Sequence, residues 1–210
     1  MELIVISSPE FLQGEARVIN ELFAAGMKRF HLRKPNASVA KLIELISAID
    51  PGYRSEVVLH QQHELADGFS MHRRHYPEAL RLIQGELLEA QKRCGMGLST
   101  SIHKLEHACT LSVFDYVFFS PVFNSISKLG YHGTLSPEFR LLKSEGTPAI
   151  IALGGVDYGN IPLVMEMNFD GVAVLGAIWN KPGSPVEHFL RIQDCIHKQL
   201  ENPVLNLGHD

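Results

Sequence analysis

The stretches Ala149-Ile-Ile-Ala-Leu-Gly-Gly155 and Gly171-Val-Ala-Val-Leu-Gly176 decide the fold of this 210-residue chain. Each is a short apolar run that ends in glycine and is followed by a longer amphipathic segment. A continuous apolar run of this length, bounded by a turn residue, is typical of a strand buried on both faces of a parallel sheet. The two stretches therefore predict two consecutive strand–helix units.

Working outward, the same alternation extends back to the N-terminus. Six earlier strands are predicted at residues 3–6, 28–32, 57–59, 68–71, 95–98 and 115–119. Helices are predicted at residues 15–25, after the cap Ser38, and at 80–92, 104–111, 137–145, 158–167 and 185–199. Eight strands alternating with helices are typical of a single α/β domain, the (β/α)₈ TIM barrel. We expect it to span residues 1–200, with a flexible tail at 201–210; an open doubly wound sheet is the alternative.

Composition excludes several classes of protein. Hydrophobic residues make up 45% and charged residues 20%, which is typical of a folded globular chain. The net charge of −4 argues against a nucleic-acid-binding protein, and no stretch approaches the roughly 18–20 apolar residues of a membrane helix. Three cysteines without a CxxC motif favour a reducing compartment, so we expect a cytoplasmic protein.

A barrel of this kind carries its active site at the carboxyl ends of its strands. Polar residues and glycines follow the predicted strands at His31, Arg33, Lys34, His60, Gln61, Ser99, Ser101, His103, Ser125, Ser127, Lys128, Gly154, Gly155 and Gly176. We therefore take this set as the candidate site.

The glycines after the last two strands indicate a phosphate site. Without a side chain, Gly154, Gly155 and Gly176 let backbone N–H groups approach an anion, and in barrels these two loops often hold a phosphate. Arg33 and Lys34 are cations directly after a strand and are placed to bind a phosphate or carboxylate. The alternatives are that the glycines only form tight turns and that Arg33 and Lys34 are a solvated rim pair.

His103 is the candidate for proton transfer, because imidazole can accept and return a proton near neutral pH. The alternative is an ordinary surface histidine. The pairs His60/His63 and His72/His75 have a spacing that can hold zinc on a helix. They lack a Cys or acidic partner at matching spacing, so no metal site is predicted there.

Several stretches together resemble one family, the thiamine phosphate synthases and the related TenI-type thiazole tautomerases. The resemblance is carried by Phe30-His-Leu-Arg-Lys34, Ser99-Thr-Ser-Ile-His-Lys-Leu-Glu-His-Ala108, Asp115-Tyr-Val-Phe-Phe-Ser-Pro-Val-Phe123 with Ser125-Ile-Ser-Lys128, Ile151-Ala-Leu-Gly-Gly-Val156 and Asp170-Gly-Val-Ala-Val-Leu-Gly-Ala-Ile178.

The resemblance implies a thiamine-biosynthesis enzyme on a TIM barrel, commonly a homodimer. Synthases of this family join hydroxymethylpyrimidine diphosphate to a thiazole phosphate, with Mg²⁺ holding the diphosphate. The glycine loops hold the thiazole phosphate. The positions implied to contact substrate are Arg33, Ser101, Ser125, Ser127 and Lys128.

The chain departs from the synthases where they bind Mg²⁺. The resemblance matches the metal-binding Asp positions to Gln61 and His75, neither of which is the carboxylate that Mg²⁺ prefers. His31 replaces a pyrimidine-facing Gln, and Lys34 is displaced by one position from a family Lys. A tautomerase needs no metal and uses His103 to move a proton, so it is the preferred interpretation. A synthase that uses Mg²⁺ and a non-catalytic sensor of a phosphorylated ligand stay open as alternatives.

Overall fold

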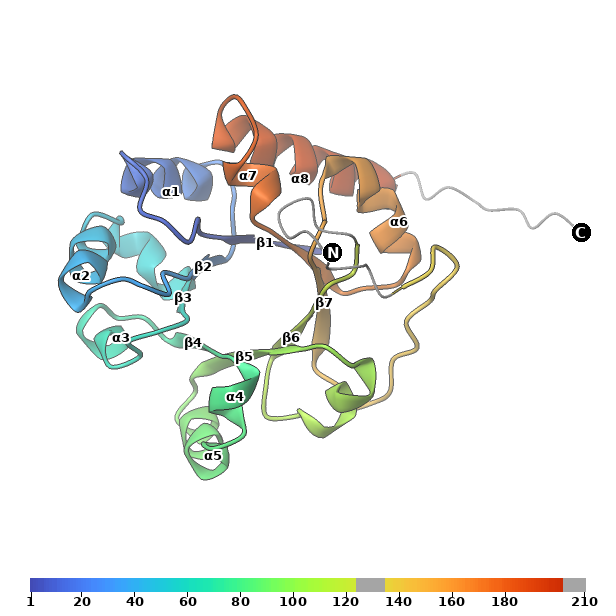
Figure 1. The fold of residues 1–210 in the computed structure, drawn as a ribbon, viewed down its shortest axis with the longest axis horizontal. Coiled ribbons are helices and arrows are strands. Elements are labelled where there is room, and N and C mark those ends of the chain that lie inside the picture. The colour runs from blue at the N-terminus through green and yellow to red at the C-terminus, as the bar shows by residue number, and fades with distance from the viewer. Residues whose placement is uncertain (124–134, 202–210) are drawn as a thin grey trace, which may run out of the picture.

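The computed structural model describes residues 1–123 and 135–201, and its strands form one closed parallel barrel in the order β1 to β8. The strands are β1 (Glu2–Ile6), β2 (Phe30–Leu32), β3 (Val57–Leu59), β4 (Arg73–Tyr76), β5 (Gly97–Ile102), β6 (Tyr116–Phe119), β7 (Ala149–Leu153) and β8 (Gly171–Val174). Figure 1 shows the strands as a central ring with helices around it. The predicted (β/α)₈ barrel is confirmed, and the open sheet is excluded.

The helices surround the barrel and cover its outer face. They are α1 (Glu15–Ala24), α2 (Val39–Ser47), α3 (Leu65–Gly68), α4 (Glu78–Arg81), α5 (Gly85–Arg93), α6 (Ile161–Glu166), α7 (Gly176–Trp179) and α8 (Pro185–Glu201), with 3-10 turns η1 (Pro51–Glu56), η2 (Leu105–Thr110) and η3 (Tyr158–Asn160). The predicted cap is confirmed, since the Ser38 side chain accepts a hydrogen bond from the backbone N–H of Lys41. Among the described residues, no helix is long and apolar enough to cross a membrane.

The barrel closes where β8 pairs with β1, with Glu2 opposite Gly171. A Cβ atom at Gly171 would lie 2.7 Å from the Glu2 carbonyl oxygen and 2.8 Å from Ile151 Cδ1. Real side chains do not approach so closely, and therefore the two strands can pair here only because residue 171 is glycine.

The interior of the barrel has two chemically different halves. One half is an apolar cluster formed by Ile4, Ile6, Tyr116, Phe118, Ile151 and Ala173. The other half, on β2 to β5, holds buried polar side chains, among them His31, His75 and Ser99. Buried polar groups need hydrogen-bond partners, and this half of the barrel supplies them to one another.

Several predicted elements differ from the structure. The helix predicted at 104–111 forms the 3-10 turn η2 instead. The fourth strand lies at Arg73–Tyr76 instead of residues 68–71, because its inward-facing residues are polar and leave no apolar run to detect. Strand β5 extends to Ile102, so Ser99 and Ser101 lie within the strand and not after it. The helix predicted at 137–145 is absent, and that segment runs as turns and irregular chain.

Candidate active site

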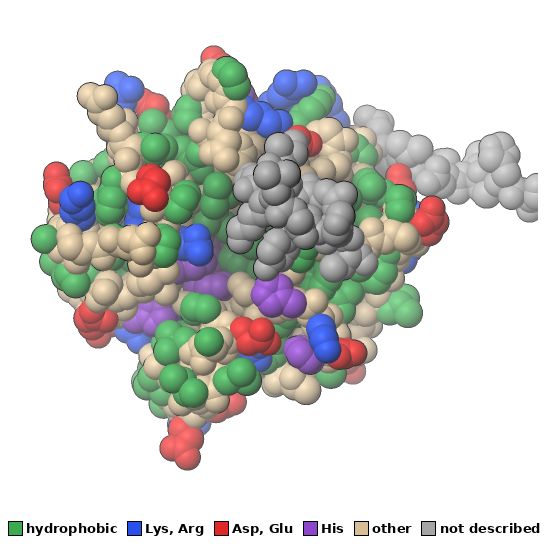
Figure 2. All heavy atoms as spheres, viewed as in Figure 1, with side chains coloured by type: hydrophobic (Ala, Val, Ile, Leu, Met, Phe, Trp, Pro, Cys, Tyr) green, Lys and Arg blue, Asp and Glu red, His purple; other side chains and the backbone are tan. Residues whose placement is uncertain are grey.

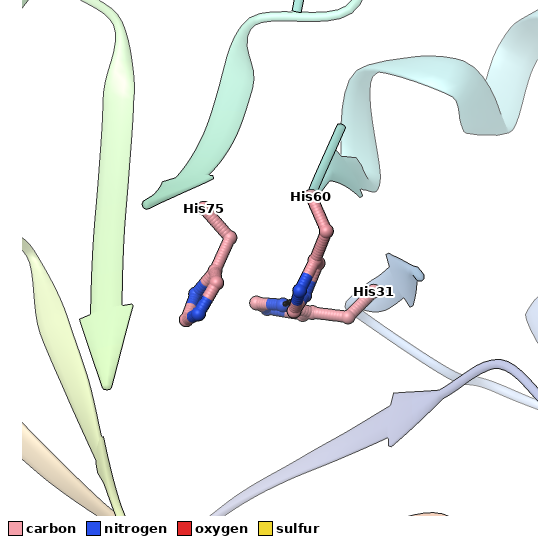
Figure 3. Close-up of side chains that lie close together, drawn as sticks. All are labelled: His31, His60 and His75. Atoms are coloured by element: carbon pink, nitrogen blue, oxygen red, sulfur yellow. Dashed lines mark hydrogen bonds between the residues drawn. The ribbon is translucent and has the colours of Figure 1, made fainter. Parts of the chain in front are cut away.

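Three histidines from consecutive strands meet inside the barrel. His31 lies on β2, His60 directly follows β3, and His75 lies on β4. His31 Nδ1 lies 2.8 Å from His60 Nε2, and one ring nitrogen from each residue lies within 4.8 Å of those of the other two. Figure 3 shows the three rings converging on one space between these strands. We call these residues the histidine cluster.

Hydroxyl groups hold the outer edges of the histidine cluster. His31 Nε2 lies 2.6 Å from the Tyr116 hydroxyl, and His75 Nδ1 lies 3.0 Å from Ser99 Oγ. His75 Nε2 lies 3.1 Å from Ser101 Oγ. The strand register explains the second contact, since His75 and Ser99 are paired neighbours on β4 and β5.

Burial keeps the histidine cluster uncharged. Removal from water, together with the nearby His63 and Arg33 side chains, lowers the pKa of His75 to about 3. Burial also holds the pKa values of His31 and His60 well below the usual range. All three rings are therefore neutral at physiological pH, and each has lone-pair nitrogen to offer.

His103 lies outside this cluster, on the exposed segment after β5. Its Nδ1 lies 2.7 Å from the Ser120 carbonyl oxygen. A carbonyl oxygen only accepts hydrogen bonds, so Nδ1 carries the hydrogen and donates it. In the neutral ring, Nε2 then keeps its lone pair and can accept a proton.

The turn after β7 has a left-handed backbone at both of its glycines. Gly154 and Gly155 have φ values of +95° and +68°, which side-chain-bearing residues rarely adopt. The backbone N–H of Phe123 donates to the Gly154 carbonyl at 3.0 Å, so the loop after β6 is joined to this turn. Gly176 begins α7, and the Trp179 indole N–H at the end of that helix donates to the Ile6 carbonyl at 2.7 Å.

Lys34 does not present its charge to a ligand in this structure. Its side chain is buried, and its ammonium group donates to both carboxylate oxygens of Glu15 at 2.7 and 2.8 Å and to the carbonyls of Ser8 and Glu10. Burial lowers the pKa of Lys34, and the hydrogen bond to Glu15 opposes that shift. The sequence interpretation of Lys34 as an anion-binding residue is therefore corrected to a structural role, whereas the adjacent Arg33 is exposed.

Other predicted residues are distributed more widely. Ser125, Ser127 and Lys128 lie outside the described residues. Neither of the pairs with zinc-like spacing, His60/His63 and His72/His75, forms a metal site in this structure. His72 is exposed, and His63 Nε2 lies 3.1 Å from the carbonyls of Leu59 and His75. The sequence did not predict that the Tyr116 hydroxyl contacts His31. The two residues lie on β6 and β2, and no local pattern indicates that these strands face each other across the barrel.

The positions that the family resemblance assigns to Mg²⁺ do not fit that ion. Gln61 uses its side-chain oxygen to accept a hydrogen bond from the Lys34 backbone N–H, and His75 offers nitrogen. Within the described chain, the charges that act on the histidine cluster come from His and Arg side chains and from no carboxylate. Mg²⁺ binds through oxygen, chiefly carboxylate oxygen, so this donor set is the wrong type.

Figure 2 shows one face of the molecule, with histidine side chains in and around a central hollow. The polar interior and this hollow occur together at one end of the barrel. His60, His103 and Gly154 each directly follow a strand, namely β3, β5 and β7.

Comparisons with known proteins agree with this arrangement. A model of the thiamine monophosphate synthase family matches residues 3–178. The thiamine-phosphate synthase of Clostridium tetani (strain Massachusetts / E88) is 24% identical over 190 residues, which cover 85% of this chain and 88% of that protein. The thiamine-phosphate synthase of Staphylococcus carnosus (strain TM300) is 30% identical over 111 residues, 51% of this chain and 49% of that one.

Solved structures support the same fold. The thiamine phosphate pyrophosphorylase of Bacteroides thetaiotaomicron has a TM-score of 0.71 at 23% identity, covering 94% of this chain and 98% of that one. The thiamine phosphate pyrophosphorylase of Pyrococcus furiosus has a TM-score of 0.72 at 17% identity, covering 95% and 96%. With the closed barrel and the family match over nearly the whole chain, this protein belongs to the thiamine monophosphate synthase family.

Proposed function

We propose that this chain is an enzyme of thiamine biosynthesis that acts on a thiazole phosphate, and that its reaction is the tautomerisation of a thiazole carboxylate phosphate. The family match and the two synthase relatives support the pathway. One observation carries the finer assignment: the Ser120 carbonyl fixes the His103 ring with Nε2 as the proton acceptor.

Tautomerisation requires one group that removes a proton from the substrate ring and returns a proton elsewhere on it. His103 Nε2 accepts the first proton, and the resulting imidazolium is stabilised by the Nδ1–H bond to Ser120, which persists in both protonation states. The imidazolium then gives a proton to the new position, and the thiazole becomes aromatic. No change in oxidation state accompanies this step.

Substrate anchoring comes from segments next to His103, since a Cβ atom at Gly154 would lie 3.2 Å from Ser120 Oγ and the Ser120 carbonyl is hydrogen-bonded to His103. The backbone turn at Gly154 and Gly155 and the start of α7 at Gly176 supply N–H groups for the phosphate. Arg33, exposed after β2, supplies a cation for a substrate carboxylate or phosphate. These anchors hold the thiazole while His103 acts, which turns proton transfer into a reaction within one complex.

The second candidate is thiamine phosphate synthesis, which the names of both relatives favour. That reaction requires a diphosphate to leave, and the family assigns Mg²⁺ to its stabilisation. The histidine cluster and Gln61 supply nitrogen and an already bonded amide where carboxylates are needed. This mismatch is why we prefer the tautomerase.

The test offers the purified chain two mixtures and separates the products by chromatography. One holds the pyrimidine diphosphate, thiazole phosphate and Mg²⁺; the other holds the unaromatised thiazole carboxylate phosphate. We expect aromatised product from the second mixture alone. Thiamine phosphate from the first mixture would instead establish the synthase, and binding without turnover in both would establish the sensor.

A matched pair of variants tests the role of His103. His103→Asn should lower turnover by about 10²–10⁴-fold and leave the dissociation constant of thiazole phosphate unchanged, because it removes the base and not the anion site. His107→Asn is the control, since His107 is also exposed and lies four residues further along in η2. Full activity in His103→Asn would overturn the assignment.

A further inference from the structure

The histidine cluster has no part in the tautomerisation proposed above, yet it is the most unusual feature of the barrel interior. His31 is fully buried, His75 is 2% exposed and His60 is 7% exposed. Three imidazoles packed together in this way supply a set of soft nitrogen donors on three rigid, adjacent strands.

We propose that His31, His60 and His75 form a binding site for a divalent transition metal, with Zn²⁺ as the best-suited ion. One nitrogen from each ring lies within 4.8 Å of those of the other two. Zn²⁺ binds imidazole nitrogen at about 2.0–2.1 Å, so its ligands in a tetrahedral site lie about 3.3 Å apart. Binding of the ion would therefore replace the 2.8 Å contact between His31 Nδ1 and His60 Nε2 and requires the rings to turn within the site.

The groups at the outer edges of the rings match what a bound metal requires. A metal-bound histidine usually donates its second ring N–H to a fixed partner, which sets the tautomer and the ring orientation. Tyr116 Oη lies 2.6 Å from His31 Nε2, and Ser99 Oγ lies 3.0 Å from His75 Nδ1. His31 Nδ1 faces His60 Nε2 at 2.8 Å (Figure 3), whereas His75 Nε2 also lies 3.1 Å from Ser101 Oγ, a contact that a metal bound at this nitrogen would replace.

The protonation state of the cluster also suits a metal. Ligand histidines must be neutral, and burial of all three rings favours the uncharged imidazole. Arg33 and Arg73 lie close enough to act on these rings, and their positive charge weakens the binding of any cation.

The donor set selects among metals. Imidazole suits Zn²⁺, Co²⁺ and Ni²⁺, whereas Mg²⁺ and Ca²⁺ require oxygen. Three histidine ligands leave a fourth tetrahedral position open, as in zinc sites that bind water or an anion. With Arg33 nearby, that position favours an anionic ligand.

The experiment strips the full-length chain with a chelator and titrates it with Co²⁺ and then Zn²⁺. We expect one equivalent of Co²⁺ to bind with the strong visible absorption of a four-coordinate ion, and one equivalent of Zn²⁺ to displace it. His75→Gln should abolish the spectrum, and Tyr116→Phe should weaken Zn²⁺ binding by about 10–100-fold. The control His72→Gln removes an exposed histidine near the start of the same strand and should bind as the natural chain does.

Three outcomes would overturn the proposal. The natural chain could bind no Co²⁺ in stoichiometric amount, or His75→Gln could keep the spectrum. A thiolate–Co²⁺ charge-transfer band would place the ion on the exposed Cys94 or Cys109. Circular dichroism checks the folding of each variant. If His75→Gln does not fold, His60→Gln replaces it, since His60 is the most exposed of the three histidines, and it should also abolish the Co²⁺ spectrum. None of these readouts depends on catalytic activity.

Discussion

Replacing Lys34 with methionine should strongly destabilise the fold, although Lys34 follows a strand at the barrel mouth. The Lys34 side chain is fully buried, and its ammonium group contacts both Glu15 oxygens and two backbone carbonyls. Lys34→Met keeps a side chain of similar length and removes the ammonium group, with both its charge and its N–H donors. The Glu15 carboxylate, 2% exposed, is then left without its cation.

The expected cost follows from that uncompensated charge. Breaking a buried ion pair by removing one partner costs about 3–5 kcal/mol of unfolding free energy, which corresponds to a drop in Tm of about 6–20 °C for a domain of this size. The double variant Lys34→Met with Glu15→Leu should recover much of the loss. It leaves only the two carbonyls without a donor, at about 1–3 kcal/mol each at most.

Thermal and urea unfolding of these variants, followed by circular dichroism, measures the cost. The control is Arg17→Ala, which breaks an Arg17–Glu21 pair whose side chains are 80% and 50% exposed and should cost about 0.5 kcal/mol or less. A Tm for Lys34→Met within the range of that control would refute the reasoning. Unchanged stability with weakened phosphate binding would instead restore Lys34 as an anion-binding residue.

Three further predictions follow from the same contacts. Below pH 6.5 the free energy of unfolding should fall by up to about 1.4 kcal/mol per pH unit for each buried histidine. The reason is that histidines of the unfolded chain take up protons in this range, whereas the pKa of His75 in the folded chain is about 3. Urea unfolding measured across this pH range checks the prediction, and His75→Gln should reduce the dependence of stability on pH. Gly154→Ala should lower the free energy of unfolding by about 1–3 kcal/mol, because φ is +95° and the added Cβ atom would lie 3.0 Å from Pro121 Cα. The control is Gly14→Ala, where φ is +71° and the Cβ atom has no neighbour within 4 Å. It should cost less stability when both variants are unfolded by heat. Trp179→Phe should cost about 1 kcal/mol in urea unfolding, because the Ile6 carbonyl loses the indole donor at 2.7 Å, and an unchanged midpoint would contradict that.

Much of the fold could be predicted because its signals are local. The apolar run Ala149–Leu153 and its glycines mark a strand and a turn within a few neighbouring residues. The same kind of signal failed at Arg73–Tyr76, whose strand has polar residues facing inward. The run 137–145 has helical spacing but forms no helix, because short segments depend on packing for their helical stability.

The candidate site was predictable only in part. Position after a strand selected Arg33 and His103, which are exposed, and equally selected Lys34, which is buried. Nothing in the local sequence distinguishes Arg33 from Lys34. Successive residues leave a strand in opposite directions, so the direction of each side chain depends on how β2 sits against its neighbours.

Local sequence was enough to predict the alternation of strands and helices and the glycine turn after β7, because each depends on residues close together in the chain. Only the tertiary structure decided that His31, His60 and His75 meet, with Tyr116 and Ser99 at their edges. Those contacts join residues up to 85 positions apart, and they depend on strand register and barrel closure. Hydrophobic periodicity reports burial of a segment but carries no information about which distant segment lies opposite.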